Sequence, residues 1–478
     1  MPGGAQPRGV GAAAPKEAIL ARIGERFEIE IEGLAAGGDG VGRHGGLVVF
    51  VEQAAPGDRL EVEVVEAFAR HLRTRVRRVL QAGPGRLEPP CPVFGRCGGC
   101  AWQHLDYPVQ LEWKRTIVVE ALRRLGHVAD PERLVAPVLA AQPPWRYRHK
   151  MAVPFAPPRQ RGGPLQAGFF AVRSHRIVDL ATCAIQHPLL DRALAETRRL
   201  ADALGVQAYD ERSRRGDLRH LVGRVSHSQD TLLLALVTAG PGFAAGPELA
   251  RGLREALPQC VGVVQNIQGA PGNAILGERT RPLAGADHLV EEIDGLRFLV
   301  SAPSFFQVSP VQAAALYREA IGQAGLARGD TVFDLYAGVG TLSLFLARTA
   351  ATVHAVEEVE AAVADGRRNA QANGMRNLRF HAGTAEAVVP TLVSRDAGPD
   401  VVVLDPPRKG ASAPVLQAVA AARPRRVVYV SCNPATLARD IGLLAEAGYG
   451  LLEVRPVDMF PQTAHVECCA VLRRDGGA

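Results

Sequence analysis

Three cysteines stand close together near the beginning of the chain, in the segment CPVFGRCGGC. Cys91, Cys97 and Cys100 have the spacing C-x5-C-x2-C, and the glycines among them let the backbone fold closely around a compact group. Three thiolates leave a fourth position open. Cys183 is the candidate for it, because the remaining cysteines lie in segments to which we assign other roles. Four cysteine ligands suit an iron–sulfur cluster or structural zinc. The spacing, with one C-x2-C pair where zinc sites usually have two, favours iron–sulfur.

Reactive side chains also follow the ends of predicted strands in the last third of the chain. Asp405 begins the loop D-P-P-R-K-G, and Cys432 lies in S-C-N-P, each directly after an apolar strand. In a doubly wound sheet such strand ends face one crevice. A thiol there is a candidate nucleophile, and Glu467, in a later segment of strand character, is a candidate general base. We assign the neighbouring Cys468 and Cys469 to the core.

A Gly-x-Gly turn joins a predicted buried strand to an amphipathic helix within residues 331–341. This arrangement is a nucleotide-type crevice. The third glycine of the dinucleotide fingerprint is absent, because Ser343 occupies its position. The next strand, at 352–356, ends at Glu357, where an acid can accept both hydroxyls of a ribose. The combination is typical of enzymes that bind S-adenosylmethionine.

The chain as a whole is long enough for about three domains, at roughly 150 residues each. Of its 478 residues, 47% are hydrophobic and 22% charged, so a globally disordered or fibrous protein is excluded. No signal peptide or membrane-length apolar run is visible. We therefore expect a cytoplasmic protein with reduced thiols and no membrane partner. Lys and Arg outnumber Asp and Glu by 55 to 49, which indicates a polyanionic partner only where the excess is clustered.

Three regions of different pattern must position these side chains. From about residue 26 to 80, short alternating runs between glycine-rich turns predict a small antiparallel barrel. Its last strand, at 70–80, is basic at nearly every second position, which fits a solvated edge strand or, as we prefer, a strand that faces nucleic acid. Between 89 and 300, basic residues recur beside aromatic ones, as at 145–150, which favours an RNA-binding surface. From 301 onward, alternating helices and strands predict a parallel sheet with helices on both faces.

The D-P-P-R-K-G and S-C-N-P elements, in this order, resemble those of the RNA 5-methyluridine methyltransferases. The resemblance covers residues 26 to 473 and is to the subgroup with a TRAM barrel and a four-cysteine iron–sulfur domain, the architecture of the large-subunit ribosomal RNA enzymes. It implies an α/β fold class with three domains after a disordered tail at 1–24. These are a small OB-like TRAM β-barrel at 25–84, a central α+β iron–sulfur and RNA-binding domain at 85–300, and a Rossmann-like, doubly wound methyltransferase domain at 301–478.

The resemblance also assigns roles to individual residues. It implies that a [4Fe-4S] cluster is held by Cys91, Cys97, Cys100 and Cys183. It implies that S-adenosylmethionine is bound by Gln307, Tyr336, Glu357 and Asp405, the last of which also lies against the uracil. Cys432 matches the nucleophile, Glu467 the base, and Phe305 an aromatic residue near the target base. Thr384 departs from the family, which has Asp or Asn there, near the adenine.

The expected activity is methylation of uracil C5 in RNA, with 23S ribosomal RNA as the substrate and a monomer as the active form. Uracil C5 is too weak a nucleophile to attack a methyl sulfonium unaided, so a thiolate must first add to C6. Three alternatives stay open. They are a transfer-RNA uracil-C5 methyltransferase, a nucleobase amino methyltransferase that uses the D-P-P loop, and a non-catalytic, RNA-binding iron–sulfur protein.

Overall fold

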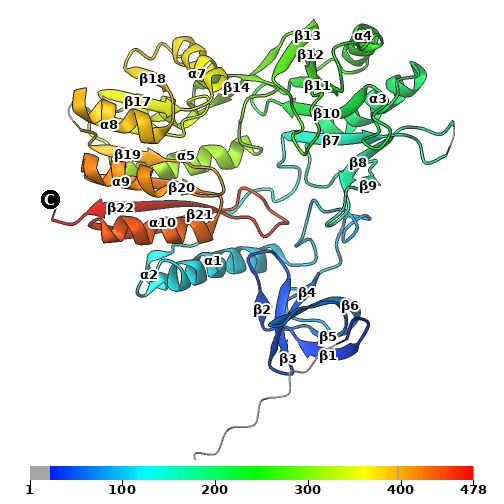
Figure 1. Ribbon diagram of the computed structural model, residues 1–478, viewed down its shortest axis with the longest axis horizontal. Coiled ribbons are helices and arrows are strands. Elements are labelled where there is room, and N and C mark those ends of the chain that lie inside the picture. Colours follow the sequence, from blue (N-terminus) through cyan, green and yellow to red (C-terminus); the bar gives the residue numbers. More distant parts are fainter. Residues whose placement is uncertain (1–21, 161, 396–397, 477–478) are drawn as a thin grey trace, which may run out of the picture. The chain divides into compact units, whose positions relative to one another are not determined.

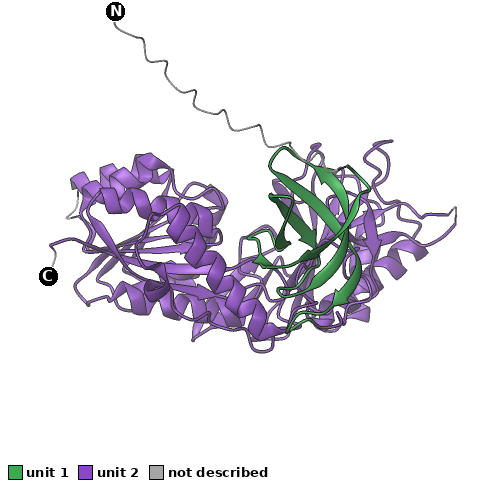
Figure 2. Ribbon diagram, turned by 90° about the horizontal axis from the view of Figure 1, so that it is seen from below, with its two compact units in different colours: residues 1–86 green, residues 87–478 purple. Residues whose placement is uncertain are grey.

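A computed structural model describes residues 22–160, 162–395 and 398–476. The chain divides into two compact units, Met1–Arg86 and Leu87–Ala478, which are coloured separately in Figure 2. None of the helices within the described ranges is long and apolar enough to cross a membrane.

The first unit is a six-stranded sheet that follows the alternating pattern of its sequence. Its strands are β1 (Arg26–Glu30), β2 (Gly33–Leu34), β3 (Gly40–His44), β4 (Leu47–Glu52), β5 (Arg59–Ala67) and β6 (His71–Gln81). Their order is β1-β5-β6-β4-β3-β2, and inward residues such as Leu60, Val62 and Leu72 form the core. The pairing is antiparallel, as expected, except that β4 and β6 run parallel. Of the predicted tail at 1–24, residues 1–21 lie outside the described part of the chain.

The arginines of the basic strand β6, which we expect to face nucleic acid, have acidic partners within the sheet. Arg75 and Arg77 both donate to Glu63, at 2.7 and 2.6 Å. These hydrogen bonds lower the pKa of Glu63 to about 2. Arg73 likewise pairs with Asp39 at 2.8 Å. The acidic cross-strand neighbours therefore neutralise part of the charge that the sequence of β6 displays, since Arg75 and Arg77 share one carboxylate.

The second unit contains a seven-stranded sheet of order β13-β12-β11-β10-β7-β8-β9. The strands are β7 (Lys150–Ala156), β8 (Gln166–Phe170), β9 (Ile177–Asp179), β10 (Leu218–Val225), β11 (Leu232–Thr238), β12 (Cys260–Ile267) and β13 (Arg279–Gly285). The helices α3 (Pro188–Ala203) and α4 (Gly246–Ala256) share one apolar core with this sheet. A hairpin, β14 (His288–Ile293) and β15 (Leu296–Ser301), follows it.

The C-terminal part of the second unit is the predicted doubly wound sheet, of order β18-β17-β16-β19-β20-β22-β21 (Figure 1). The parallel strands are β16 (Thr331–Leu335), β17 (Thr352–Glu357), β18 (Leu378–Ala382), β19 (Val401–Leu404) and β20 (Arg426–Ser431). The strands β21 (Tyr449–Val457) and β22 (Glu467–Arg474) add an antiparallel edge that the pattern does not predict.

Helices cover both faces of this sheet, as the sequence predicts. They are α5 (Pro310–Ala324), α6 (Thr341–Ala347), α7 (Glu360–Ala372), α8 (Ala385–Arg395), α9 (Ala413–Ala422) and α10 (Pro434–Glu446). Because side chains of a strand alternate between faces, Val401 and Val403 join one apolar core while Val402 and Leu404 join the other. This two-sided burial explains why β19 is apolar at every position.

The helix α1 (Tyr107–Arg124) belongs by sequence to the predicted central domain but packs on the C-terminal part. Its residues Val118 and Leu122 lie in the core that α10 also covers. After the short helix α2 (Pro131–Leu134), the chain forms bridges with the edge strand β21. This segment covers backbone groups of an otherwise open sheet edge.

Candidate active site

Four of the predicted site residues stand where parallel strands end. Tyr336 follows β16, Glu357 ends β17, Asp405 follows β19 and Cys432 follows β20. Parallel strands bring these ends to one edge of the sheet, and the order of strands reverses between β16 and β19, where ligands bind in open α/β sheets. Tyr336 has a φ of 64°, a left-handed conformation that costs energy for a bulky residue and is concentrated at functional sites.

The turn after β16 requires glycine and is fastened by Glu357. Gly340 has a φ of 78°, and a Cβ there would lie 2.5 Å from the ring of Phe380. The carboxylate of Glu357 accepts hydrogen bonds from the backbone N–H groups of Gly338, at 2.9 Å, and Val359, at 2.8 Å. A carboxylate has about four lone-pair sites, so Glu357 retains acceptor capacity for ribose hydroxyls beside a fixed turn.

A buried acid that the sequence analysis did not single out lies next to this turn. Asp334, within β16, accepts a hydrogen bond from the Ser343 hydroxyl at 2.5 Å. Burial raises the pKa of Asp334 to about 7, and the nearby Asp405 and Glu357 add to the effect. The signal in the sequence was the charged residue inside an otherwise apolar strand, TVFDL. Ser343, noted only as a missing glycine, is therefore the hydrogen-bond partner of this acid.

A cavity of about 540 Å³ in the second unit brings the predicted nucleophile and base together. Cys432 and Glu467 both line it, and so do Phe305 and Gln307 from the loop between β15 and α5. Asp405 lies outside the lining but acts electrostatically on both Cys432 and Glu467. The cavity thus holds a thiol and a carboxyl group that sequence separates by 35 positions (467 − 432).

Burial makes the Cys432 thiol and the Glu467 carboxyl group weaker acids than usual. It raises the pKa of the Cys432 thiol, and the negative charge of Glu467 raises that pKa further. It also raises the pKa of Glu467 to about 8, with Asp405 acting in the same direction. Burial alone raises the pKa of Asp405 to about 7. Perturbed pKa values of this kind, clustered at one cavity, are characteristic of acid–base sites.

Two further residues of the cavity, Arg408 and His465, received no role in the sequence analysis. Arg408 belongs to D-P-P-R-K-G, and its Nη2 lies 2.9 Å from Nδ1 of His465. Both side chains line the cavity together with Cys432 and Glu467. Their positions in the sequence could have identified them, because each lies within three residues of an assigned site residue.

The loop that carries Phe305 and Gln307 is held from the central sheet. His149 donates its backbone N–H to the Val308 carbonyl at 2.7 Å, and the buried Arg224 donates to the carbonyls of Ala302 and Ser304. Phe305 is 67% exposed, which suits an aromatic surface for a base and not a core residue.

The four predicted cluster ligands, Cys91, Cys97, Cys100 and Cys183, line the same cavity as Cys432. All are free thiols. Burial raises the pKa of Cys100 to about 12, and the charges of the other three cysteines act on it in the same direction, which indicates that the four sulfur atoms are near one another. No group of three or more His, Cys, Asp or Glu side chains in the described ranges is arranged to hold a single metal ion.

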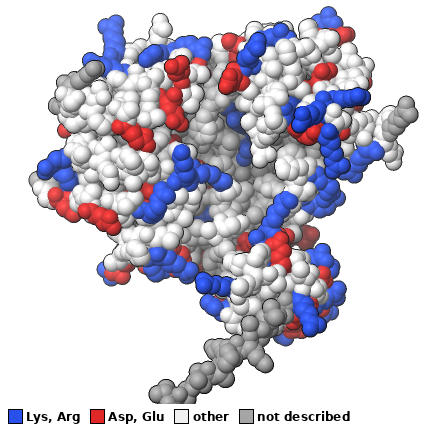
Figure 3. Space-filling model, in the orientation of Figure 1, with Lys and Arg blue, Asp and Glu red and all other residues white. Residues whose placement is uncertain are grey.

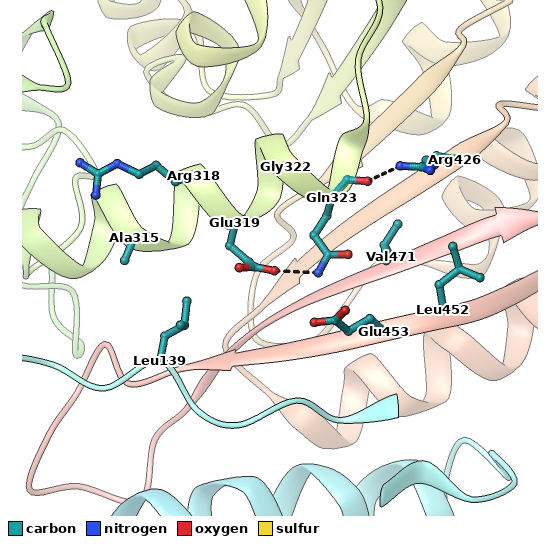
Figure 4. Close-up of a pocket in the computed structure, with 10 residues that line it drawn as sticks. All are labelled: Leu139, Ala315, Arg318, Glu319, Gly322, Gln323, Arg426, Leu452, Glu453 and Val471. Carbon is teal, nitrogen blue, oxygen red and sulfur yellow. Dashed lines mark hydrogen bonds between the residues drawn. The ribbon is translucent and has the colours of Figure 1, made fainter. Parts of the chain in front are cut away.

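A second depression, of about 670 Å³, lies between α5 and the antiparallel strands (Figure 4). Its polar groups bind one another, since Gln323 donates to Glu319 at 2.7 Å and its carbonyl accepts from Arg426 at 3.0 Å. None of the predicted site residues lines this depression.

The basic and aromatic stretch at 145–150 is partly structural. Tyr147 is buried and donates its hydroxyl proton to the Pro461 carbonyl at 3.0 Å, so it does not offer a ring for stacking on RNA. Arg146 pairs with Asp191, whereas Arg148 lines the cavity. Figure 3 shows Lys and Arg mixed with Asp and Glu over one face of the second unit, with basic side chains inside the recess of that face.

Two family models match the chain. The model described as tRNA (Uracil-5-)-methyltransferase matches residues 301–475, and the TRAM domain model matches residues 21–76. An RNA methyltransferase of Halalkalibacterium halodurans is 42% identical, over 93% of this chain and 96% of that protein. One from Gloeobacter violaceus is 44% identical, over 94% and 97%.

A solved structure has the same fold over nearly all of the chain. It is the tRNA (uracil-54, C5)-methyltransferase of Pyrococcus abyssi in complex with S-adenosyl-L-homocysteine, with a TM-score of 0.73 and 25% identity. The similarity covers 93% of this chain and 99% of that one. The α/β fold class with a TRAM domain and a Rossmann-like C-terminal domain is thereby confirmed.

Proposed function

Because the chain belongs to the RNA methyltransferases with a uracil-5-methyltransferase domain and uses S-adenosylmethionine, we propose that it methylates C5 of a uridine in 23S ribosomal RNA through a covalent bond between Cys432 and C6. The observation that carries the mechanism is the shared cavity of Cys432, Glu467 and the exposed Phe305. A nucleobase amino methyltransferase would need neither the thiol nor the buried carboxyl group.

Each of these cavity residues has its own role in the proposed reaction. The Cys432 thiolate forms a bond to C6, which moves electron density to C5 as an enolate. Bound S-adenosylmethionine supplies the methyl group that C5 takes, and leaves as S-adenosylhomocysteine. The Glu467 carboxylate then accepts the C5 proton, the bond between sulfur and C6 breaks, and the thiolate is regenerated. Phe305 offers its ring to the uracil, which must leave its stack to enter the cavity.

The cofactor site that we propose lies at the strand ends described above. Tyr336, in its left-handed conformation, and Glu357, fixed by two backbone donors, would hold the nucleoside. Gln307 would bind the cofactor, and Asp405 would lie between the cofactor and the uracil. Thr384 is exposed after β18, so the adenine there would meet a hydroxyl and not a carboxylate or amide.

We propose further that Cys91, Cys97, Cys100 and Cys183 hold a [4Fe-4S] cluster. Four free thiols that line one cavity supply the required number of thiolates. In such a cluster each cysteine binds a different iron atom, so the sulfur atoms need not converge on one ion. The cluster would supply a rigid link between distant segments, and no step of the reaction uses it.

Iron and sulfide analysis of anaerobically purified protein tests the cluster. We expect about four iron and four sulfide per chain and a brown protein, and Cys183→Ser should lose most of the iron. Colourless protein that contains zinc would overturn this assignment.

The covalent mechanism is tested with RNA that contains 5-fluorouridine, which lacks the C5 proton that Glu467 must remove. The wild type should form a protein–RNA complex that survives denaturing electrophoresis. Cys432→Ala should form none, while Cys260→Ala, which removes a thiol from the central sheet, should behave as the wild type. A complex formed by Cys432→Ala would show that another residue is the nucleophile.

The choice of ribosomal over transfer RNA rests on the four-cysteine and TRAM architecture, although the Pyrococcus abyssi protein is named for a tRNA site. Mass-spectrometric mapping of 5-methyluridine in 23S and transfer RNA from a strain without the gene decides it. We also propose a cytoplasmic monomer, which light scattering of the purified enzyme tests.

A further inference from the structure

Arg408 is anchored directly to the loop that carries the nucleophile. Its carbonyl accepts hydrogen bonds from the Asn433 side-chain amide, at 3.0 Å, and the Thr436 hydroxyl, at 3.3 Å. Asn433 also caps α10, through a hydrogen bond from the backbone N–H of Ala435. The D-P-P-R-K-G and S-C-N-P loops therefore form one connected unit, with the Arg408 side chain in the cavity beside Cys432.

Most features around Cys432 disfavour its thiolate form, and Arg408 alone favours it. Burial and the negative charges of Glu467 and Asp405 all raise the pKa of this thiol. Arg408, whose side chain lines the same cavity, is the group that lowers that pKa. Arg408 also lowers the pKa of Glu467, which burial and Asp405 raise. One cation thus acts on both groups that must lose a proton for the reaction.

His465 fixes the position of this cation. A ring nitrogen that lies 2.9 Å from an arginine Nη2 must accept, because guanidinium nitrogens only donate. Partial burial of the ring and the charges of Arg408, Lys114 and Arg148 lower the pKa of His465 to about 4. The imidazole is therefore neutral at physiological pH and available as the acceptor.

We propose that Arg408 is a catalytic residue, whose guanidinium stabilises Cys432 as the thiolate that attacks C6 and Glu467 as the carboxylate that accepts the C5 proton, with His465 as its positioning residue. The inference rests on the proposed function. It explains how a half-buried thiol that shares its cavity with Glu467 becomes reactive near neutral pH. Both Arg408 and His465 are exposed, so substitutions there leave the apolar core intact.

The pH dependence of Cys432 alkylation by iodoacetamide measures the thiolate directly, in the full-length enzyme without RNA. Trypsin cuts after Arg426 and Arg439, so the peptide of residues 427–439 contains Cys432 as its only cysteine, and mass spectrometry follows it alone. Removing an opposite charge beside a titrating group shifts its midpoint by about 1 to 3 pH units. We expect Arg408→Gln to move the midpoint upward by that amount and His465→Ala to move it upward by less.

Two variants control the measurement. Arg408→Lys retains the charge and should recover part of the shift, whereas Lys409→Gln removes the adjacent exposed charge and should leave the midpoint unchanged. An unchanged midpoint in Arg408→Gln, or an equal shift in Lys409→Gln, would overturn the role of Arg408.

The 5-fluorouridine complex keeps this inference separate from the proposed function. If the wild type forms the complex and Arg408→Gln titrates like the wild type, only the role of Arg408 fails. If the wild type forms no complex, the covalent mechanism fails, whatever the alkylation midpoints are. We expect complex formation by Arg408→Gln at pH 7 to be slower by about tenfold or more, since the thiolate fraction at that pH falls about tenfold when the pKa of the thiol rises by one.

Discussion

Glu467 is a carboxyl group at the start of β22 that is only 5% exposed, and its environment determines how the reaction ends. Its pKa of about 8 makes it a stronger base than an exposed glutamate. Proton acceptors with a pKa near the working pH are effective in general base catalysis. The same burial that disfavours its charge therefore suits it to accept the C5 proton.

We expect Glu467→Gln to stop the reaction after methyl transfer, because an amide cannot accept the proton. The variant should accumulate a methylated covalent RNA complex, visible on a denaturing gel, and turnover should fall by at least about 100-fold. Glu446→Gln, an exposed substitution at the end of α10, should turn over normally. Normal product release by Glu467→Gln would exclude Glu467 as the base.

Glu467 also makes the free energy of unfolding depend on pH. Glu467 has a pKa of about 8 in the folded protein against an ordinary value of 4.5, so the folded state binds more protons between these values. The free energy of unfolding then falls as pH rises through this range. Glu467→Gln removes this contribution to the pH dependence, so the difference in Tm, variant minus wild type, should be more positive at pH 9 than at pH 5. Equal differences at both pH values would contradict the raised pKa.

At the scale of elements, helix α1 holds the segment between β21 and β22 that leads to the base. The Lys114 ammonium lies 2.5 Å from Oδ1 of Asp458, and neither side chain has any exposed surface. Lys114 also donates to the Phe460 carbonyl at 3.0 Å, and Gln110 on the same helix exchanges hydrogen bonds with Gln462. The helix thereby fixes the path of the chain toward His465 and Glu467.

We expect Lys114→Met to lower the free energy of unfolding by about 3–5 kcal/mol, because it leaves the Asp458 carboxylate buried without its partner. Arg124→Gln, which breaks an exposed pair with Glu120 on the same helix, should cost at most about 1 kcal/mol. Urea unfolding of both variants checks this. Equal losses of unfolding free energy in the two variants would mean that the buried Lys114–Asp458 pair stabilises the protein no more than an exposed pair on α1 does.

At the scale of the whole molecule, the distribution of paired and unpaired charges determines how RNA is bound. Arg96 and Arg176 line a small cavity of about 220 Å³ beside the cysteine segment, and neither has an acidic partner among the described residues. Arg77 on β6, by contrast, is paired with Glu63. Only arginines without acidic partners are ready to replace counterions on phosphates.

We expect RNA affinity to fall steeply with salt concentration, and Arg96→Gln and Arg176→Gln each to reduce the slope of log affinity against log salt by about one. Arg77→Gln should change the slope less, because its guanidinium is already paired with the Glu63 carboxylate within the TRAM unit. Filter binding across a salt series gives the slopes. An Arg77→Gln effect as large as the others would mean that RNA breaks the pair with Glu63.

The sequence by itself determined the fold class and the kind of chemistry, because both depend on local signals. Alternation and apolar periodicity specify strands and helices, and the motifs D-P-P-R-K-G and S-C-N-P place Asp405 and Cys432 at strand ends. Only the tertiary structure decided which charges meet, since burial and distance are properties of the folded chain. Lys114 and Asp458 are 344 positions apart and Arg408 and His465 are 57 apart, and no local pattern records such pairs. Tyr147 was misjudged for the same reason, because its sequence shows an aromatic residue among basic ones but not the packing that buries its ring. The acidic partners of the β6 arginines are equally invisible in the sequence of that strand.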